Sequence, residues 1–174
     1  MRHRCSKFLL GIPLLVAAGT LAAQQRPTLQ IDGTNIQPLQ ITSTELAKMP
    51  RLSVDVRNPH SGTAEHYEGV RVSDLLAKAG VPLGEKLRGR GLAMYIFVQA
   101  SDGYGVVYSI AEIDPAMNEN RIILADKMDG KPLGEHDGPF KVVAPGEKRP
   151  ARWVRMVTAL HVESAVSPSE SLPR

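Results

Sequence analysis

The sequence predicts an α+β domain with a mixed, mostly β sheet and a few short helices. Residues 24–174 contain 13 glycines and 12 prolines, and this frequency favours short elements joined by turns over long helices. Apolar residues mostly recur with the period of two that is typical of strands. Because the expected helices do not alternate regularly with the strands, the pattern argues against a doubly wound parallel sheet.

Six or seven short strands are expected from these patterns. Leu52, Val54 and Val56 alternate with polar residues, and residues 153–162 alternate in the same way, so both segments predict half-buried strands. Residues 93–98 are all apolar, which predicts a strand buried on both faces. The remaining strands are expected near residues 66–67 and over 104–108, 121–125 and 140–143.

Three short helices are expected, over residues 43–48, 70–79 and 109–112. Thr42 and Glu45 have the spacing of a capping box, and Ser109 and Glu112 repeat it, so two of the helices have a predicted start. The middle helix has Ser73 or Asp74 as a candidate cap at its start and a glycine after its end.

Residues 1–23 have the pattern of a secretory signal peptide. Basic residues at positions 2, 4 and 7 come first, an apolar run over 8–18 follows, and mostly small residues fill 19–23; this order is typical of export signals. The apolar run is shorter than the roughly 20 residues that a transmembrane helix needs. We therefore expect a periplasmic or secreted protein with no stable membrane span after cleavage; an uncleaved membrane anchor is the alternative.

Removal of this leader would leave a neutral protein without cysteine. The whole chain has 21 basic and 18 acidic residues, so 18 residues of each sign remain. A neutral chain gives no support to nucleic-acid binding, which depends on concentrated positive charge. Cys5 is the only cysteine, so the mature protein would have no disulfide, no thiolate nucleophile and no cysteine-ligated metal. In the mature chain, residues 24–38 are expected to form a polar lead-in, 39–163 the folded domain and 164–174 a flexible tail.

Candidate binding residues concentrate in the segment 130–153. Its cations, with glycines between them, are Lys131, His136, Lys141, Lys148, Arg149 and Arg152. Cations combined with free backbone N–H groups suit a phosphate or another anion, and a solvated basic rim is the alternative. The histidines at 60, 66, 136 and 161 show no i, i+4 pairing on a helix, so the sequence assigns no metal ligand.

An ordered set of short motifs resembles the molybdopterin-binding domain of the sulfite oxidase family, and most of all its small exported bacterial members. The motifs lie at 67–80, 99–104, 124–125, 129–133, 138–146 and 152–154. This resemblance covers residues 39–162 and implies a sulfite-oxidase-type fold and a molybdopterin cofactor whose phosphate is held by basic and backbone groups. It also implies three cofactor-binding residues. Lys141 stands where the family usually has an arginine, Arg152 where it usually has a lysine, and His136 lies near the family's histidine-containing loop.

The sequence departs from this family at the metal. The family fixes molybdenum with a cysteine thiolate, expected just after the strand at residues 52–56, but residues 56–60 read Val-Arg-Asn-Pro-His. If the pterin's own sulfurs held the metal, Asp55 or His60 would lie nearby. Two functions stay open: an exported oxidoreductase with a cysteine-free molybdenum site, or a cofactor-free binding or accessory module of the same fold. The partner would be an anionic small molecule or a redox partner, and no catalytic residue is assigned.

Overall fold

The computed structural model describes residues 27–58 and 61–166, which form two β-sheets. The first sheet has the strand order β2–β1–β10–β5–β6. Its strands are β1 (Thr28–Gly33), β2 (Leu39–Thr42), β5 (Met94–Ala100), β6 (Gly105–Ser109) and β10 (Val157–Ser164). β1 and β10 run parallel, and the other neighbouring pairs are antiparallel. The expected signal peptide and His60 lie outside the described residues.

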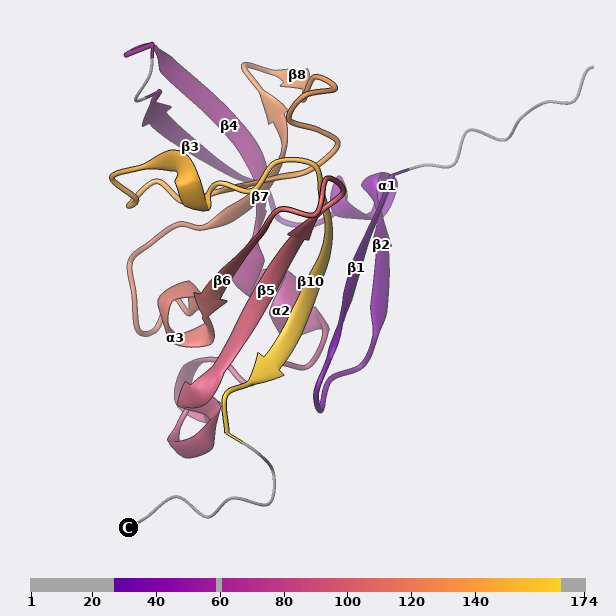
Figure 1. Cartoon of the computed structure of the whole chain (residues 1–174), viewed down its shortest axis with the longest axis vertical. Helices are drawn as coiled ribbons and strands as arrows, with labels where there is room; N and C mark the ends of the chain where they lie inside the picture. The colour runs from indigo at the N-terminus through magenta and orange to yellow at the C-terminus, as the bar shows by residue number, and fades with distance from the viewer. Residues whose placement is uncertain (1–26, 59–60, 167–174) are drawn as a thin grey trace, which may run out of the picture.

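The second sheet lies at one end of the first (Figure 1). Its strands are β3 (Leu52–Arg57), β4 (Ala64–Arg71), β7 (Ile123–Met128) and β8 (Lys131–Pro132), in this order, and β9 (Lys141–Val143) also pairs with β7. All pairings in this sheet are antiparallel. A mixed first sheet beside an antiparallel second sheet, with short helices between strands, confirms the predicted α+β class.

The helices are short: α1 (Ser43–Leu46), α2 (Val72–Lys78), α3 (Ile110–Ile113), and the 3-10 helices η1 (Gly84–Lys86), η2 (Gly89–Ala93) and η3 (Pro150–Arg152). The capping box of Thr42 and Glu45 is present, and Ser109 accepts a hydrogen bond from the backbone N–H of Glu112. The predicted start of the middle helix was wrong. Strand β4 continues through Arg71, so α2 begins at Val72 without a side-chain cap. None of the helices in the described parts of the chain is long and apolar enough to cross a membrane.

The segment expected to be a polar lead-in contains a central element of the fold. Leu29 and Ile31 of β1 are fully buried, and Ile31 pairs with Leu160 of β10. Only two apolar residues mark this strand in the sequence, because polar residues alternate with them and face outward. The lead-in prediction therefore missed the strand that joins β2 to the rest of the sheet.

Strand β5 is buried on one face, not on both as predicted. Ile96 and Val98 point into the main hydrophobic core, while Tyr95 and Phe97 are half-buried on the opposite face. The Phe97 ring stacks on His161 there, with ring centroids 6.2 Å apart. Its continuous apolar run thus reflects aromatic cover of the outer face, which a count of apolar residues cannot distinguish from burial.

Two hydrophobic clusters share one side chain, Trp153. The larger cluster joins the first sheet to α2 and α3 and includes Leu75, Ile96 and Leu160. The smaller one lies in the second sheet and is made of Val54, Tyr67, Ile123, Ala125 and Val143. Trp153 packs against both. The last strand, β10, starts only at Val157, since Met156 has a positive φ of 50° and breaks the alternation expected from residue 153.

Candidate ligand-binding site

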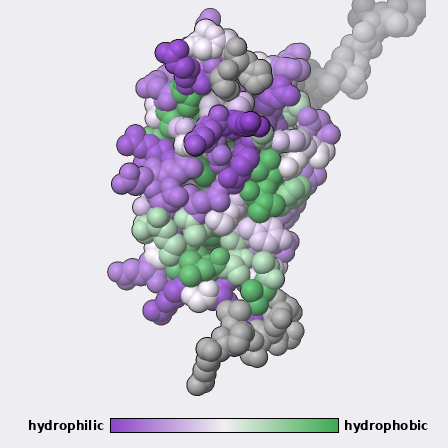
Figure 2. All heavy atoms as spheres, turned by 60° about the vertical axis from the view of Figure 1, so that its left-hand side comes forward, coloured by the Kyte–Doolittle hydropathy of each residue, from purple (hydrophilic) through white to green (hydrophobic). Residues whose placement is uncertain are grey.

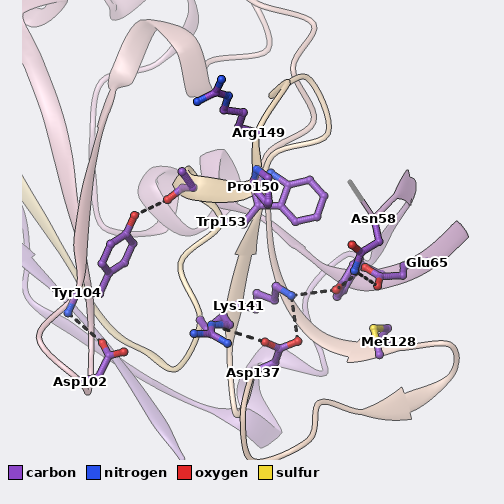
Figure 3. A pocket seen from close by; sticks show the side chains of 13 residues that line it. Asn58, Glu65, Asp102, Tyr104, Met128, Asp137, Lys141, Arg149, Pro150 and Trp153 are labelled. Carbon is purple, nitrogen blue, oxygen red and sulfur yellow. Dashed lines mark hydrogen bonds and ion pairs between the residues drawn. The ribbon is translucent and has the colours of Figure 1, made fainter. Parts of the chain in front are cut away.

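A cavity of about 840 Å³ is lined by strands of the second sheet and by loops, including one loop of the first sheet. The lining comes from the β3–β4 hairpin, the turn between β5 and β6, the end of β7, and the segments at 137–141 and 149–155 (Figure 3). Small-molecule sites in proteins are commonly clefts of roughly 300–1,000 Å³. The cavity therefore has the size of a small-molecule site and joins segments far apart in the sequence.

A hydrogen-bonded network of charged and polar groups forms one wall of the cavity. Lys141 is 8% exposed, and its Nζ donates to Tyr67 Oη at 2.9 Å and to Asp137 Oδ2 at 3.0 Å. Tyr67 in turn donates to Glu65 Oε2 at 3.0 Å, and Glu65 Oε1 accepts from Asn58 Nδ2 at 2.7 Å. Burying a charge is costly unless it is paired and hydrogen-bonded, so Asp137 is what allows a lysine at this depth.

Burial raises the pKa of the Tyr67 phenol far above its ordinary value, and the hydrogen bond to Glu65 raises it further. Tyr67 therefore keeps its proton at every physiological pH. Its hydroxyl acts as a fixed relay that accepts from Lys141 and donates to Glu65.

Aromatic side chains form the other walls. Trp153 meets the Tyr67 ring edge to face, with centroids 6.3 Å apart, and its Nε1 donates to Ala144 O at 3.0 Å. Tyr104 is 48% exposed and donates its phenol proton to Ala151 O.

Figure 2 shows that the face bearing α3 and β6 is polar over much of its area, with apolar residues gathered at about the height of α3. Four large hydrophobics of the described chain are exposed, Leu92, Tyr104, Val107 and Met117, and of these only Tyr104 lines the cavity.

Some charged side chains of the cavity lining form ion pairs with one another, and others do not. Asp137 serves two cations, Lys141 at 3.0 Å and Arg155 Nε at 3.9 Å. Arg149 is exposed, lines the cavity and forms no ion pair with any residue of the described chain. Glu65 and Asp102 add negative charge elsewhere in the lining. An anion and a group rich in hydrogen-bond donors could therefore bind in the same cavity at different places.

The structure brings one of the three predicted cofactor-binding residues to this cavity. Lys141 lines it, whereas His136 is exposed outside the lining and Arg152 also lies outside it. Arg152 forms ion pairs with Glu112 and with Glu147, the latter at 2.6 Å, and donates to Val107 O at 3.0 Å. Its guanidinium also lies 4.2 Å from the centroid of the Tyr108 ring. Arg152 thus ties η3 to α3 and β6.

The pKa of Arg152 is raised above the ordinary arginine value. Burial works against the charged form, but the hydrogen bond to Glu112 and the charges of Glu112 and Glu147 outweigh it. Arg152 is therefore always charged, and its charge is compensated by the carboxylates of Glu112 and Glu147. Whether His136, Lys141 and Arg152 bind a cofactor stays a prediction.

Sequence reasoning did not single out the residues that shape the cavity most. Tyr67 and Trp153 entered only as parts of motifs, and Glu65, Tyr104 and Asp137 were not proposed as ligand contacts. The strand pattern of the sequence did contain a signal for Tyr67 and Glu65. Tyr67 pairs with Val54 across the β3–β4 hairpin, and the period of two places Glu65 on the same face as Tyr67.

The donor set of the cavity does not fit a molybdenum ion fixed by a protein thiolate. Asn58 stands in the segment where the resemblance expects cysteine, and its amide is hydrogen-bonded to Glu65. No three His, Cys, Asp or Glu residues of the described chain lie close enough together to hold a metal ion. Asp55 is 86% exposed in its side chain and pairs with His66. Val54 pairs with Tyr67, which lines the cavity. Because successive side chains of a strand point to opposite faces, Asp55 faces away from the cavity.

The fold and the site together define a class of protein: a mixed, mostly β domain with a cavity lined by aromatic and charged side chains. Residues 18–171 match the family described as the oxidoreductase molybdopterin binding domain, so the chain belongs to this family. A search of curated proteins found no match.

Among solved structures, the chain is similar to the sulfane dehydrogenase SoxCD from Paracoccus pantotrophus. The TM-score is 0.62 at 21% sequence identity, and the match covers 83% of this chain and 40% of that chain. The similarity confirms the predicted molybdopterin-binding fold of mostly β mixed sheets. This chain corresponds to less than half of the matched SoxCD chain.

Proposed function

We propose that this chain is an exported protein that binds a molybdopterin-type ligand, a planar pterin carrying an anionic group, in the cavity between Tyr67, Tyr104 and Trp153. The observation that carries the proposal is the cavity itself: a family of molybdopterin-binding domains and a cavity of about 840 Å³ with aromatic walls coincide in one chain. The signal-peptide pattern of residues 1–23 supports export to the periplasm or beyond.

The groups in the cavity match the chemistry of a pterin. Trp153 and Tyr104 offer aromatic surface to a planar ring, and aromatic pairs favour stacked or edge-to-face contact. The ring's amino and N–H groups are donors, for which the carboxylates of Glu65 and Asp137 are acceptors with free lone pairs. Lys141 can donate to a ring carbonyl with the N–H that Tyr67 and Asp137 leave unused.

Binding, not metal-centred catalysis, is the function that these residues support best. Amide and carboxylate oxygens are harder ligands than a thiolate and do not replace it at a soft metal site. The finer form of the proposal, a periplasmic oxidoreductase with a cysteine-free molybdenum site, requires the pterin's own sulfurs to hold the metal. One observation favours a cofactor-free binding or accessory module instead. No buried side-chain nitrogen or oxygen of the described residues lacks a hydrogen-bond partner, so the fold is satisfied without a cofactor.

Co-purification separates these forms. The protein is expressed with its leader in a host that makes molybdopterin, purified from the periplasm, and analysed for pterin and molybdenum per chain. Close to one pterin per chain supports the proposal, and an equal amount of molybdenum extends it to the oxidoreductase. Absence of both contradicts it in favour of the accessory module.

A matched pair of variants locates the bound pterin. Tyr104→Ala removes exposed aromatic surface from the cavity, whereas Leu92→Ala removes an equally exposed apolar side chain outside it. Tyr104→Ala should lower the pterin content and Leu92→Ala should not. Equal pterin content in both variants would contradict the placement of the ligand in this cavity.

A further inference from the structure

We infer that the open edge of β3 binds an extended peptide segment of a partner protein, in which apolar residues alternate with lysine or arginine. The segment adds to the second sheet as a strand antiparallel to β3. Its site is a second hollow of about 710 Å³, termed here the edge groove, which is lined by residues 53–55, 118–121 and 145–146. The edge groove shares no lining residue with the aromatic cavity, so the inference goes beyond the proposed function and does not depend on it.

Backbone groups of β3 point into the edge groove. β3 is the outermost strand of the second sheet (Figure 1), and within the described chain only β4 pairs with it. The Asn58 N–H donates to Thr63 O at 2.8 Å, one step beyond the last register pair of this ladder. Hydrogen-bonded and non-hydrogen-bonded pairs alternate along an antiparallel ladder, so Val54 bonds to β4. Ser53 and Asp55 therefore direct their N–H and C=O groups away from β4.

The other side of β4 agrees with this assignment. His66, which stands opposite Asp55, uses its carbonyl to accept the Asp129 N–H at 2.8 Å, on the side away from β3. Within residues 27–58 and 61–166, the outward backbone groups of Ser53 and Asp55 have no hydrogen-bond partner. A row of unpaired N–H and C=O groups is a template for the addition of a strand.

The far wall of the edge groove offers further hydrogen bonds to a peptide. Asn118 Oδ1 accepts the Asn120 N–H at 2.8 Å, and Asn120 Oδ1 accepts the Gly146 N–H at 3.4 Å. The NH2 groups of both side chains have no partner in the part of the chain that the structure describes, and each can donate to a peptide carbonyl.

This wall also determines what kind of chain fits. An edge strand of a second folded molecule would bring its own neighbouring strand about 4.8 Å behind it, into the loops at 118–121 and 145–146 that bound the groove. A single extended segment has no such neighbour. The occupant is therefore a free segment of another protein and not a second copy of this sheet.

Charge and side-chain direction define the chemistry of the segment. The edge groove carries two carboxylates, Asp55 and Glu119, and one guanidinium, Arg121. His66 Nδ1 pairs with Asp55 Oδ1 at 2.7 Å, which leaves Oδ2 of this exposed carboxylate available. Residues of the segment directly opposite Asp55 have side chains on the same face, where lysine or arginine forms an ion pair. The residues between them lie on the face of Val54, where apolar side chains extend the smaller hydrophobic cluster.

The test uses a synthetic peptide, acetylated and amidated Lys-Val-Lys-Val-Lys-Val, titrated into the purified protein by calorimetry. In the antiparallel arrangement the lysine N–H groups face β3 and the valine N–H groups face away from it. Methylation of two lysine backbone nitrogens should weaken binding by about tenfold or more, as expected for the loss of two hydrogen bonds. Methylation of two valine nitrogens adds the same bulk and should weaken binding by about threefold or less. Equal weakening by both would overturn the inference.

Variants of the protein test the same contacts from the other side. Ser53→Pro deletes an N–H that points into the edge groove and no bond to β4, and proline is tolerated on edge strands in this position. Asp55→Lys reverses the charge that faces the lysines. Each should weaken binding by about fivefold or more. Glu85→Lys makes the same charge change at an exposed position outside the edge groove and should leave binding unchanged. Wild-type affinity in both groove variants would overturn the inference.

Two further outcomes also count against it. If sedimentation shows that the protein alone is a dimer which the lysine peptide dissociates, the edge binds a second copy and the inference is wrong. If the wild type does not bind the lysine peptide, or binds a peptide with glutamate in place of lysine equally well, the inference is wrong as well. The proposed function is unaffected by these results, because pterin content is measured separately and depends on other residues.

Discussion

Removal of the Arg152 guanidinium should destabilise the protein without lowering the amount of pterin that co-purifies with it. Arg152→Met keeps the apolar stem of the side chain and deletes the charged head. The change removes the ion pairs with Glu112 and Glu147, the hydrogen bond to Val107 O and the contact with the Tyr108 ring. It also leaves two carboxylates close to one another without their shared cation.

The size of the effect follows from the exposure of these groups. Arg152, Glu112 and Glu147 have side chains that are 35%, 29% and 24% exposed, so each ion pair should contribute about 0.5–1 kcal/mol. The hydrogen bond contributes about 1 kcal/mol and the cation–π contact a similar amount. Because one side chain makes all these contacts, they do not add fully. We expect a loss of about 2–3 kcal/mol in the free energy of unfolding and a fall of about 5–10 °C in Tm.

Urea unfolding followed by circular dichroism measures this loss. Lys148→Met is the control, since it removes an exposed cation from the same segment and should change stability by less than about 0.5 kcal/mol. If Arg152→Met unfolds like the wild type but co-purifies with less pterin, Arg152 is a ligand contact and its assignment as an internal tie is wrong.

Three other changes probe the fold and the cavity. Lys141→Met should lower the free energy of unfolding by about 2 kcal/mol, because it leaves a half-buried carboxylate and the Tyr67 hydroxyl without their donor; thermal unfolding measures this. The hydrogen bond with His161 holds the pKa of Asp32 below its usual value, so this carboxylate stabilises the fold above the unfolded-state pKa, and the contribution is lost as the pH falls through the folded-state pKa. Asp32→Asn should therefore reduce stability at neutral pH and flatten the acid-unfolding curve; an unchanged curve would refute the linkage. Gly69→Ala should cost about 3 kcal/mol or more, because a Cβ there would lie 2.1 Å from a backbone carbonyl oxygen of β7, whereas Gly134→Ala, with nothing within 4 Å, should cost far less.

The elements marked by local patterns could be predicted from the sequence. Two helix starts depend on capping residues three positions apart, and both are present. The alternation of Leu52, Val54 and Val56 gave β3 its position and its buried face. Strand β1 could not be found in this way. Its burial depends on pairing with β10, which lies some 130 residues later in the chain, and two apolar residues carry too little signal alone.

The candidate site was harder to predict for the same reason. The basic character of segment 130–153 is visible in the sequence, but which of its cations are free depends on carboxylates supplied by other elements. Glu112 comes from α3 and lies 40 residues before Arg152. The Tyr67 hydroxyl that accepts from Lys141 comes from β4, 74 residues away. Charge counting along the chain could not separate Arg149 from Arg152, whereas their partners in space do.

The fluorescence of Trp153 tests most directly whether the cavity is the ligand site. It is the only tryptophan in the chain, and it lines the cavity. Titration with phosphorylated 6-hydroxymethylpterin should quench its emission saturably, at one ligand per chain, and Tyr104→Ala should weaken this binding. A ligand that binds by calorimetry while the emission of Trp153 stays unchanged would show that the pterin lies elsewhere.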